Sequence, residues 1–151
     1  MKLRDFIKIQ SRSVITIGPE ETASAAIQKL VENNIGALPV CNDEGTLLGI
    51  ISERDLLKES FQRCAVIGIT KVKNVMTKQV AIGSPEDDLD YVVSVMKQKR
   101  IRHLPIVVDQ KLKGIVSIRD IVDIQLEETK AQIRYIGLLP RRASIEKRRL
   151  V

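Results

Sequence analysis

The sequence predicts a mixed α/β fold of the α+β type, built from two copies of one β-α-β-β-α unit that pack against each other. Three short segments recur in the same order, which indicates an internal duplication. The recurring segments are PEE at 19–21 and PED at 85–87, IGALPV at 35–40 and IRHLPI at 101–106, and GIISERD at 49–55 and GIVSIRD at 114–120. A unit of about 60 residues buries only roughly 60% of its unfolded surface, so we expect the two copies to share a core.

Each copy is expected to begin with an extended segment and a helix. The β-branched residues 14–17 end at a Gly-Pro turn signal, and residues 80–82 end at a similar one. Apolar side chains then recur at helical spacing. They are Ala23, Ala26, Ile27, Leu30 and Val31 in the first copy, and Leu89, Val92, Val93 and Met96 in the second. Thr22 and Asp88 precede these stripes and are expected to cap the two helices.

Each copy is expected to close with a β-hairpin and a second helix. The predicted strands span residues 37–41 and 47–51 around a turn at 42–45, and residues 104–108 and 112–116 around a turn at 109–111. Ser52 and Ser117 are suitable N-caps for the helices that follow. We expect the last helix to run to about Tyr135, because Pro140 blocks a simple continuation.

Composition and length limit the class of protein. Hydrophobic residues make up 44% of the chain and charged residues 29%, and no apolar run approaches the ~20 residues of a membrane span. The N-terminus lacks the apolar core of a signal peptide, so we expect a cytoplasmic protein. Cys41 and Cys64 match no metal-ligand spacing and are expected to be free thiols. The predicted boundaries are 1–65 and 66–128 for the two copies, and 129–151 for a helical extension and basic tail.

The net charge of +6 lies entirely in the C-terminal segment. Residues 1–128 carry equal numbers of basic and acidic side chains, whereas residues 129–151 carry seven basic residues and one acidic residue. Such a tail could bind nucleic acid by neutralising phosphates, although no aromatic residues alternate with the arginines after Pro140. A solvated end is the alternative.

The recurring Gly-x-x-Ser-x-Arg-Asp block joins the end of a strand to the start of a helix. Its glycine allows close approach of another group, and its serine and the free N–H groups of the helix can bind an anion such as phosphate. Its arginine adds positive charge, and its aspartate offers two acceptor oxygens that suit a pair of ribose hydroxyls. These residues are Ser52, Arg54 and Asp55, and Ser117, Arg119 and Asp120. Alternatively, the serine only caps the helix and the aspartate only complements its dipole.

Together these blocks resemble a tandem pair of CBS domains, often called a Bateman module. The resemblance covers about residues 10–128 and depends on IGALPV at 35–40, GIISERD at 49–55, RIRHLPI at 100–106 and GIVSIRD at 114–120. It implies a pseudo-twofold pair with two clefts between the repeats, in a regulatory protein such as an energy sensor that often dimerises. Such modules commonly bind AMP, ADP, ATP, S-adenosylmethionine or a dinucleotide such as NAD, so we expect an adenosyl effector and no obligatory cofactor.

The resemblance also implies roles for individual residues. Asp55 and Asp120 would hold ribose hydroxyls, and Ser52 and Ser117 would contact phosphate or ribose. The two adenine pockets would be walled by Thr16 with Gly36, Ala37, Leu38 and Pro39, and by Ile82 with His103, Leu104 and Pro105.

Positive charge is unequal between the two copies. Arg100, Arg102 and His103 would bring positive charge to phosphates. The second copy has Arg102-His103 where the first has Gly36-Ala37. We therefore expect the more basic pocket to favour a ligand with more phosphates.

The sequence argues against catalysis and against a metal site. It contains one histidine, and it shows no nucleophile beside a base, no paired carboxylates in a plausible pocket and no phosphate loop of the Walker type. We expect a ligand-sensing module that changes the relative angle of its repeats and signals to an effector protein in trans. The alternative is a nucleic-acid-binding or protein-interaction adaptor that uses the basic tail.

Overall fold

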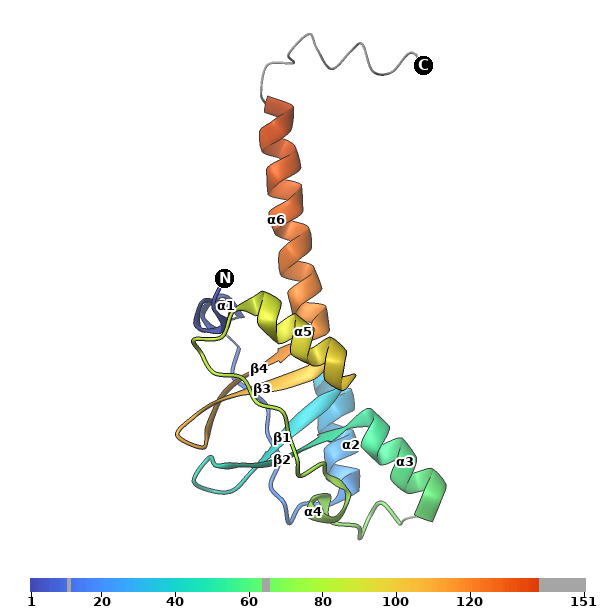
Figure 1. Cartoon of the computed structure of the whole chain (residues 1–151). Helices are drawn as coiled ribbons and strands as arrows, with labels where there is room; N and C mark the ends of the chain where they lie inside the picture. The colour runs from blue at the N-terminus through green and yellow to red at the C-terminus, as the bar shows by residue number, and fades with distance from the viewer. Residues whose placement is uncertain (11, 64–65, 139–151) are drawn as a thin grey trace. The chain divides into compact units, whose positions relative to one another are not determined.

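The computed structural model describes residues 1–10, 12–63 and 66–138 (Figure 1). The chain divides into a body, Met1–Ser117, and a second unit that begins at Ile118. The body contains α1 (Leu3–Gln10), α2 (Ala23–Asn33), β1 (Ala37–Cys41), β2 (Leu47–Ser52), α3 (Glu53–Arg63), α4 (Val72–Val75), α5 (Leu89–Lys99), β3 (His103–Val108) and β4 (Lys111–Ser117), and the second unit contains α6 (Ile118–Leu138). Cys64 and the predicted basic tail after residue 138 lie outside the described residues.

Both predicted β-hairpins are present and confirm the mixed α/β repeat. They form separate two-stranded antiparallel sheets, β1 with β2 and β3 with β4. Each register contains one irregularity, at equivalent positions in the two repeats. The second hairpin turns at Asp109 and Gln110, whose φ angles of 50° and 63° suit a two-residue type I′ turn.

The predicted opening strands are reduced to single bridges, which corrects the sequence-based expectation. Ile17 pairs in parallel with Val40, and its counterpart Gly83 pairs with Ile106. The N–H of Gly18, the next residue, donates instead to Oε2 of Glu21 at 2.6 Å. The turn after the bridge therefore takes the donor that a longer ladder would need.

The helix caps differ between the repeats. The Thr22 hydroxyl accepts a hydrogen bond from the N–H of Ala25 at 3.1 Å, which confirms the predicted cap of α2. Asp88 occupies the N-cap position of α5 without a cap hydrogen bond, because its carboxylate pairs with Lys2 at 3.0 Å. The last helix, α6, continues past Tyr135, its predicted end.

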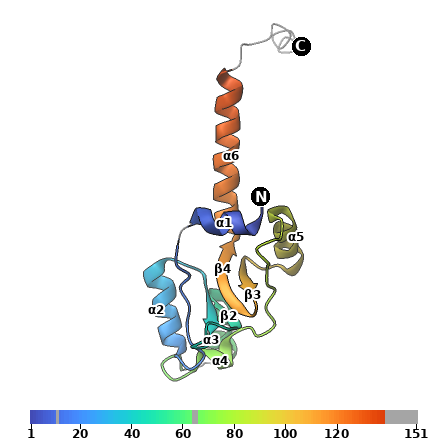
Figure 2. The same cartoon turned by 90° about the vertical axis from the view of Figure 1, so that its left-hand side faces the viewer.

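The two repeats exchange the short helices that precede them in the chain. α1 precedes the first repeat, yet it bonds to the second repeat. The N–H of Leu3 donates to the carbonyl of Asp87, and the N–H of Leu89 donates to the carbonyl of Met1, both at 3.0 Å. In Figures 1 and 2, α1 accordingly lies beside the start of α5.

α4 precedes the second repeat and bonds to the first repeat in the same way. The N–H of Val72 donates to the carbonyl of Glu21 at 2.8 Å, and the N–H of Ala23 donates to the carbonyl of Thr70 at 2.7 Å. These two hydrogen bonds are the counterparts of the two that α1 makes with the second repeat. The exchange gives the body its pseudo-twofold character, and neither α1 nor α4 was predicted from the sequence.

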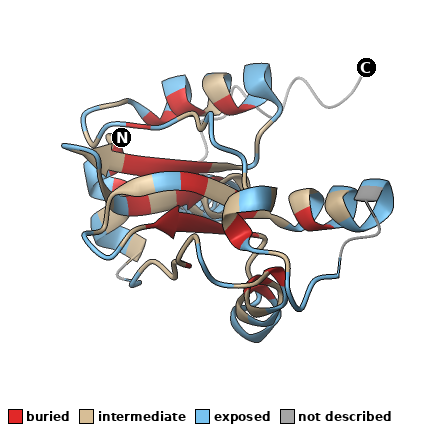
Figure 3. Cartoon of the chain, turned by 90° about the horizontal axis from the view of Figure 1, so that it is seen from below, coloured by how far each residue is buried: buried red, intermediate tan, exposed pale blue. Residues whose placement is uncertain are grey.

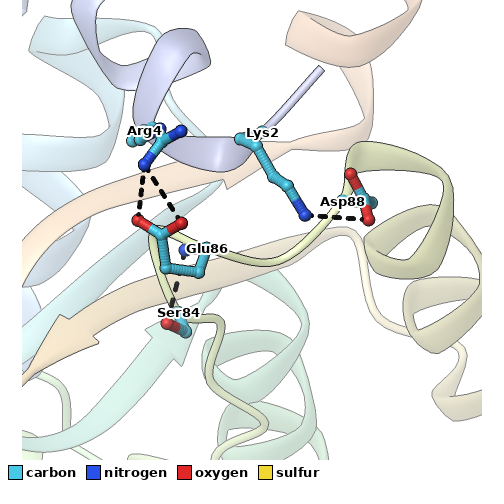
Figure 4. A network of polar contacts seen from close by, with 5 residues as sticks. All are labelled: Lys2, Arg4, Ser84, Glu86 and Asp88. Atoms are coloured by element: carbon cyan, nitrogen blue, oxygen red, sulfur yellow. Dashed lines mark hydrogen bonds and ion pairs between the residues drawn. The ribbon is translucent and has the colours of Figure 1, made fainter.

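Ion pairs reinforce the exchange at the surface. Figure 4 shows Lys2 paired with Asp88, and Arg4 paired through both oxygens of Glu86 at 3.0 and 3.1 Å. Since all four side chains are substantially exposed, these pairs add little to stability individually.

The exchanged helices contribute buried side chains. Leu3 and Phe6 of α1 are 0% exposed although they stand at the start of the chain, and Val72 of α4 is also 0% exposed. Val72 belongs to the core cluster of the first repeat. Figure 3 shows buried residues along the strands and on one side of the helices. Each repeat therefore completes its core with the short helix that precedes the other repeat in the chain.

Gly49 of β2 lies where the chain that follows α4 packs against the first hairpin. Ile50 and Thr77 exchange two backbone hydrogen bonds, at 3.0 and 2.8 Å. A Cβ on Gly49 would lie 2.7 Å from the carbonyl oxygen of Thr77 and 2.8 Å from the sulfur of Met76. The predicted close approach is confirmed, and the approaching group is the chain's own backbone.

Gly49→Ala should therefore destabilise the protein by about 1–3 kcal/mol through overpacking. Urea unfolding followed by circular dichroism measures the effect. Gly68→Ala is the matched control and should be close to neutral, since no atom lies within 4 Å of a Cβ built there. Equal stabilities of the two variants would contradict the close approach.

Glu20, which pairs with two lysines at α4, should make the stability of the fold depend on pH. Lys71 and Lys73 bind its carboxylate and lower the pKa of Glu20 from 4.5 to about 2. A lowered folded-state pKa stabilises the fold above the unfolded value, and this contribution is lost as pH falls from about 4.5 toward 2. Glu20→Gln should lower the melting temperature at pH 7, and the difference should shrink below pH 4.5. The same substitution in a Lys71→Met, Lys73→Met background should have no such effect, and a difference that persists there would refute the assignment.

Candidate functional site

A cleft of about 180 Å³ opens in the body between the two repeats. In the first repeat its walls come from the start of β1, the end of β2 and the first turn of α3. The others come from the segment that follows α4 and from the residues between α5 and the start of β3. The lining residues are Gly36, Ala37, Ile50, Ser52, Arg54, Asp55, Thr77, Gln79, Val80, Ala81, Arg100, Ile101, Arg102 and His103.

Asp55 is held at one side of the cleft by a reciprocal cap. Its Oδ2 accepts hydrogen bonds from the N–H and the hydroxyl of Ser52, both at 2.9 Å, and its own N–H donates to the Ser52 hydroxyl at 3.3 Å. This geometry is a capping box at the start of α3. The predicted N-cap role of Ser52 is confirmed.

The second oxygen of Asp55 faces the segment that enters the second repeat. The Thr77 hydroxyl donates to Oδ1 of Asp55 at 3.2 Å. A carboxylate oxygen can accept more than one hydrogen bond, so Oδ1 retains capacity for a further donor. The cap thus fixes the carboxylate in orientation and leaves it able to bind a hydroxyl in the cleft.

The opposite side of the cleft is basic. Arg100 and Arg102, which lie between α5 and β3, line the cleft together with Arg54, and Asp55 is the carboxylate among the lining residues. Arg100 ends α5 in the left-handed region, at φ 54°. Three guanidinium groups against one carboxylate favour an anionic ligand.

Gly36 of the first repeat and His103 of the second, at positions where the two repeats differ in sequence, lie in contact. A Cβ on Gly36 would lie 3.2 Å from Cε1 of His103, so the imidazole lies directly against this glycine. The carbonyl of Gly36 accepts the N–H of Glu53 at 3.1 Å. A long side chain at position 36, like that of Arg102 in the second repeat, would have to displace His103.

The structure gathers eight of the predicted site residues into this cleft: Gly36, Ala37, Ser52, Arg54, Asp55, Arg100, Arg102 and His103. The sequence predicts a separate and more basic pocket in the second copy, with Arg102 and His103 beside it. In the structure they instead line the same cleft as Ser52 and Asp55.

The other predicted residues lie elsewhere. Leu38 and Pro39 are buried in β1, and Leu104 and Pro105 are buried in β3. Ile82 is 56% exposed and lines neither this cleft nor the hollow beside Cys41.

Thr16 borders a separate, wider hollow beside Cys41 and Asn42. Ser117 ends β4, and Arg119 and Asp120 lie in the first turn of α6. The Cys41 thiol is free, as predicted, and burial raises its pKa.

Sequence reasoning missed six lining residues: Ile50, Thr77, Gln79, Val80, Ala81 and Ile101. Four of them belong to the segment after α4. Its sequence signal is the predicted extended stretch at 80–82, of which Val80 and Ala81 line the cleft and Ile82 does not.

Two absences hold within the described part of the chain. Residues 1–10, 12–63 and 66–138 contain no cluster of three or more His, Cys, Asp or Glu side chains that could bind a metal ion. Over the same residues, no helix is long and apolar enough to cross a membrane.

Comparison with known proteins identifies the repeats. A family model described as the CBS domain matches residues 4–61 and 72–127. A protein of Thermofilum pendens, the uncharacterized 33.4 kDa protein in ribosomal RNA operon, is 37% identical over 109 residues, which cover 72% of this chain and 35% of that protein. The CBS domain-containing protein YhcV of Bacillus subtilis is 32% identical over 118 residues, 78% of this chain and 83% of YhcV. The chain therefore spans about a third of the first relative and most of the second.

A solved structure extends the comparison. The CBS domain pair of protein MJ0100, crystallised in complex with 5′-methylthioadenosine and S-adenosyl-L-methionine, is 25% identical to this chain with a TM-score of 0.74. The match covers 85% of this chain and 98% of that one. The chain belongs to the CBS domain family, and its two repeats form a CBS domain pair.

Proposed function

We propose that the cleft binds an adenosine nucleotide that carries phosphate. The observation that supports this proposal best is the convergence of a fixed carboxylate, Asp55, from one repeat with two arginines, Arg100 and Arg102, from the other. A carboxylate suits paired ribose hydroxyls, and guanidinium groups suit phosphate oxygens.

The remaining walls suit the base. Val80, Ala81, Ile50 and Ile101 provide apolar contacts along the cleft. Small-molecule sites commonly combine such apolar walls with a few polar groups that fix orientation. We infer that the base packs against these side chains, the ribose binds Asp55, and the phosphates face the arginines.

The MJ0100 complex supports an adenosyl ligand, because that CBS domain pair was crystallised with two adenosyl compounds. The charge of this cleft favours a different member of the class. S-adenosylmethionine carries a cationic sulfonium, which three nearby arginines would repel, and 5′-methylthioadenosine is uncharged and has no phosphate for them to bind. We therefore infer a preference for AMP, ADP or ATP over the two ligands of MJ0100.

Ligand binding would join the two repeats. A ligand that touches both favours one relative arrangement over others, and this differential affinity is the requirement for signalling. We infer a non-catalytic sensor that acts on an effector protein in trans.

Asp55→Asn should weaken AMP binding about tenfold or more, because a hydrogen bond to a charged group contributes roughly 1.5–3 kcal/mol. Isothermal titration calorimetry measures the affinity. Asp87→Asn is the matched control, since Asp87 also accepts a backbone N–H from three residues upstream, at 2.8 Å, but lies outside the cleft. Equal affinities of the two variants would refute the role of Asp55, and an absence of AMP, ADP and ATP binding by the unmodified chain would refute the proposed function.

Arg102→Ala should weaken ATP binding more than AMP binding, because ATP places more negative charge near the guanidinium group. We expect a loss of about tenfold for ATP and a smaller loss for AMP. Lys99→Ala removes a nearby exposed cation that does not line the cleft and should leave both affinities unchanged. An equal loss for both nucleotides would contradict a phosphate contact at Arg102.

A further inference from the structure

Glu53, the first residue of α3, lies beside the imidazole of His103 from the other repeat. The point where a Cβ on Gly36 would lie is 3.5 Å from Nε2 of His103 and 3.9 Å from Cδ of Glu53. A side chain at position 36 would occupy this space, and glycine leaves it open. A carboxylate of the first repeat and an imidazole of the second therefore converge on one glycine.

The backbone at the start of α3 holds Glu53 in this place. Its N–H donates to the carbonyl of Gly36 at 3.1 Å. Glu53 does not line the cleft, whereas His103 does. An effect of Glu53 on a ligand in the cleft would therefore act through His103.

The carboxylate of Glu53 is available to the imidazole. It makes no hydrogen bond or ion pair with any other residue in the described part of the chain. Glu53 is exposed, so its side chain has room to turn toward His103, which is half-buried. A protonated imidazole donates from both ring nitrogens and would attract this carboxylate.

The charged groups around His103 act on its proton in opposite directions. Guanidinium groups disfavour a protonated imidazole, and carboxylates favour it. Ser117, which pairs with His103 across the β3–β4 ladder, is uncharged. The groups that disfavour the proton are Arg54, Arg100 and Arg102 in the cleft, the groups that favour it are Asp55 and Glu53 on α3, and Arg119 and Asp120, which follow Ser117 in the chain, carry one charge of each sign.

The two carboxylates of α3 differ in how far they are already engaged. Asp55 accepts hydrogen bonds from Ser52 and from the Thr77 hydroxyl, whereas Glu53 accepts none within the described residues. We propose that Glu53 is a positioning residue for nucleotide binding, which pairs with protonated His103 across the two repeats and so keeps a proton on the imidazole that faces the ligand. This inference rests on the proposed function, because it requires a phosphate in the cleft.

Nucleotide binding should consequently be coupled to uptake of a proton. A bound phosphate favours the charged imidazole, so it raises the pH at which His103 loses its proton. The affinity is then highest below the titration midpoint of the ligand-free protein, and it falls as pH rises through the midpoint of the complex. Glu53 sets where on the pH scale this fall occurs.

Nuclear magnetic resonance of the full chain without nucleotide tests the pair itself. The chain contains one histidine, so its ring protons report on His103 alone. Glu53→Gln should lower the titration midpoint of the ring by about half a pH unit, the size expected for one exposed charge pair. Glu59→Gln removes the same charge from the same helix, almost two turns further on, and should leave the midpoint unchanged. Equal midpoints in Glu53→Gln and the unmodified chain would overturn the proposal.

The same titration with saturating AMP tests the coupling. AMP should raise the midpoint of the unmodified chain by about one pH unit, which corresponds to about tenfold tighter binding by the protonated form. Calorimetry should show the affinity falling toward high pH, and His103→Gln should remove this fall. The phosphate of AMP titrates near pH 6, and any pH dependence that persists in His103→Gln belongs to the phosphate.

Glu53→Gln distinguishes a positioning role from simple repulsion. It should move the fall in AMP affinity to lower pH by about half a unit, and thus weaken binding most near the midpoint of the complex. Repulsion between Glu53 and the phosphate would instead make the variant bind more tightly at every pH, and that result, or AMP binding with an unmoved midpoint, would contradict the proposal. If AMP, ADP and ATP all fail to bind, the proposed function is refuted, and the titration without nucleotide still decides whether Glu53 and His103 form a pair.

Discussion

Backbone hydrogen bonds that exchange the leading helix of each repeat hold the body together. α1 bonds to Asp87 and Leu89 of the second repeat, and α4 bonds to Glu21 and Ala23 of the first. Neither repeat has its full core without the segment that the other supplies. A repeat of this size buries a small share of its surface and would be only marginally stable alone, and the exchange joins two such units into one body.

The cleft is a consequence of this exchange. The chain that leaves α4 pairs with β2 at Ile50 and Thr77 before it reaches the second repeat. That path places apolar residues of the segment beside the capped carboxylate of Asp55, and it brings the arginines near β3 to the other side. A ligand between these groups would therefore act on the same segment that joins the two repeats.

Local structure could be predicted from the sequence, and long-range pairing could not. The hairpins and the Thr22 cap follow from turn residues, alternation and helical spacing within a few positions. The short helices α1 and α4 carry no recurring motif, and their partners lie far away in the chain. Arg102 and Gly36 lie in one cleft because the repeats face each other, whereas alignment of the repeats had separated them. Thr77 precedes every recurring motif of the second copy, so only the structure could bring it to Asp55.

Nuclear magnetic resonance of the full chain during addition of AMP tests the central claim most directly, because it reports on both repeats at once. The account predicts amide shift changes that cluster at Gly36, Asp55 and Thr77 and also at Arg102 and His103, with one common saturation curve. Changes confined to a single repeat, or none at saturating AMP, would contradict a nucleotide site between the two repeats.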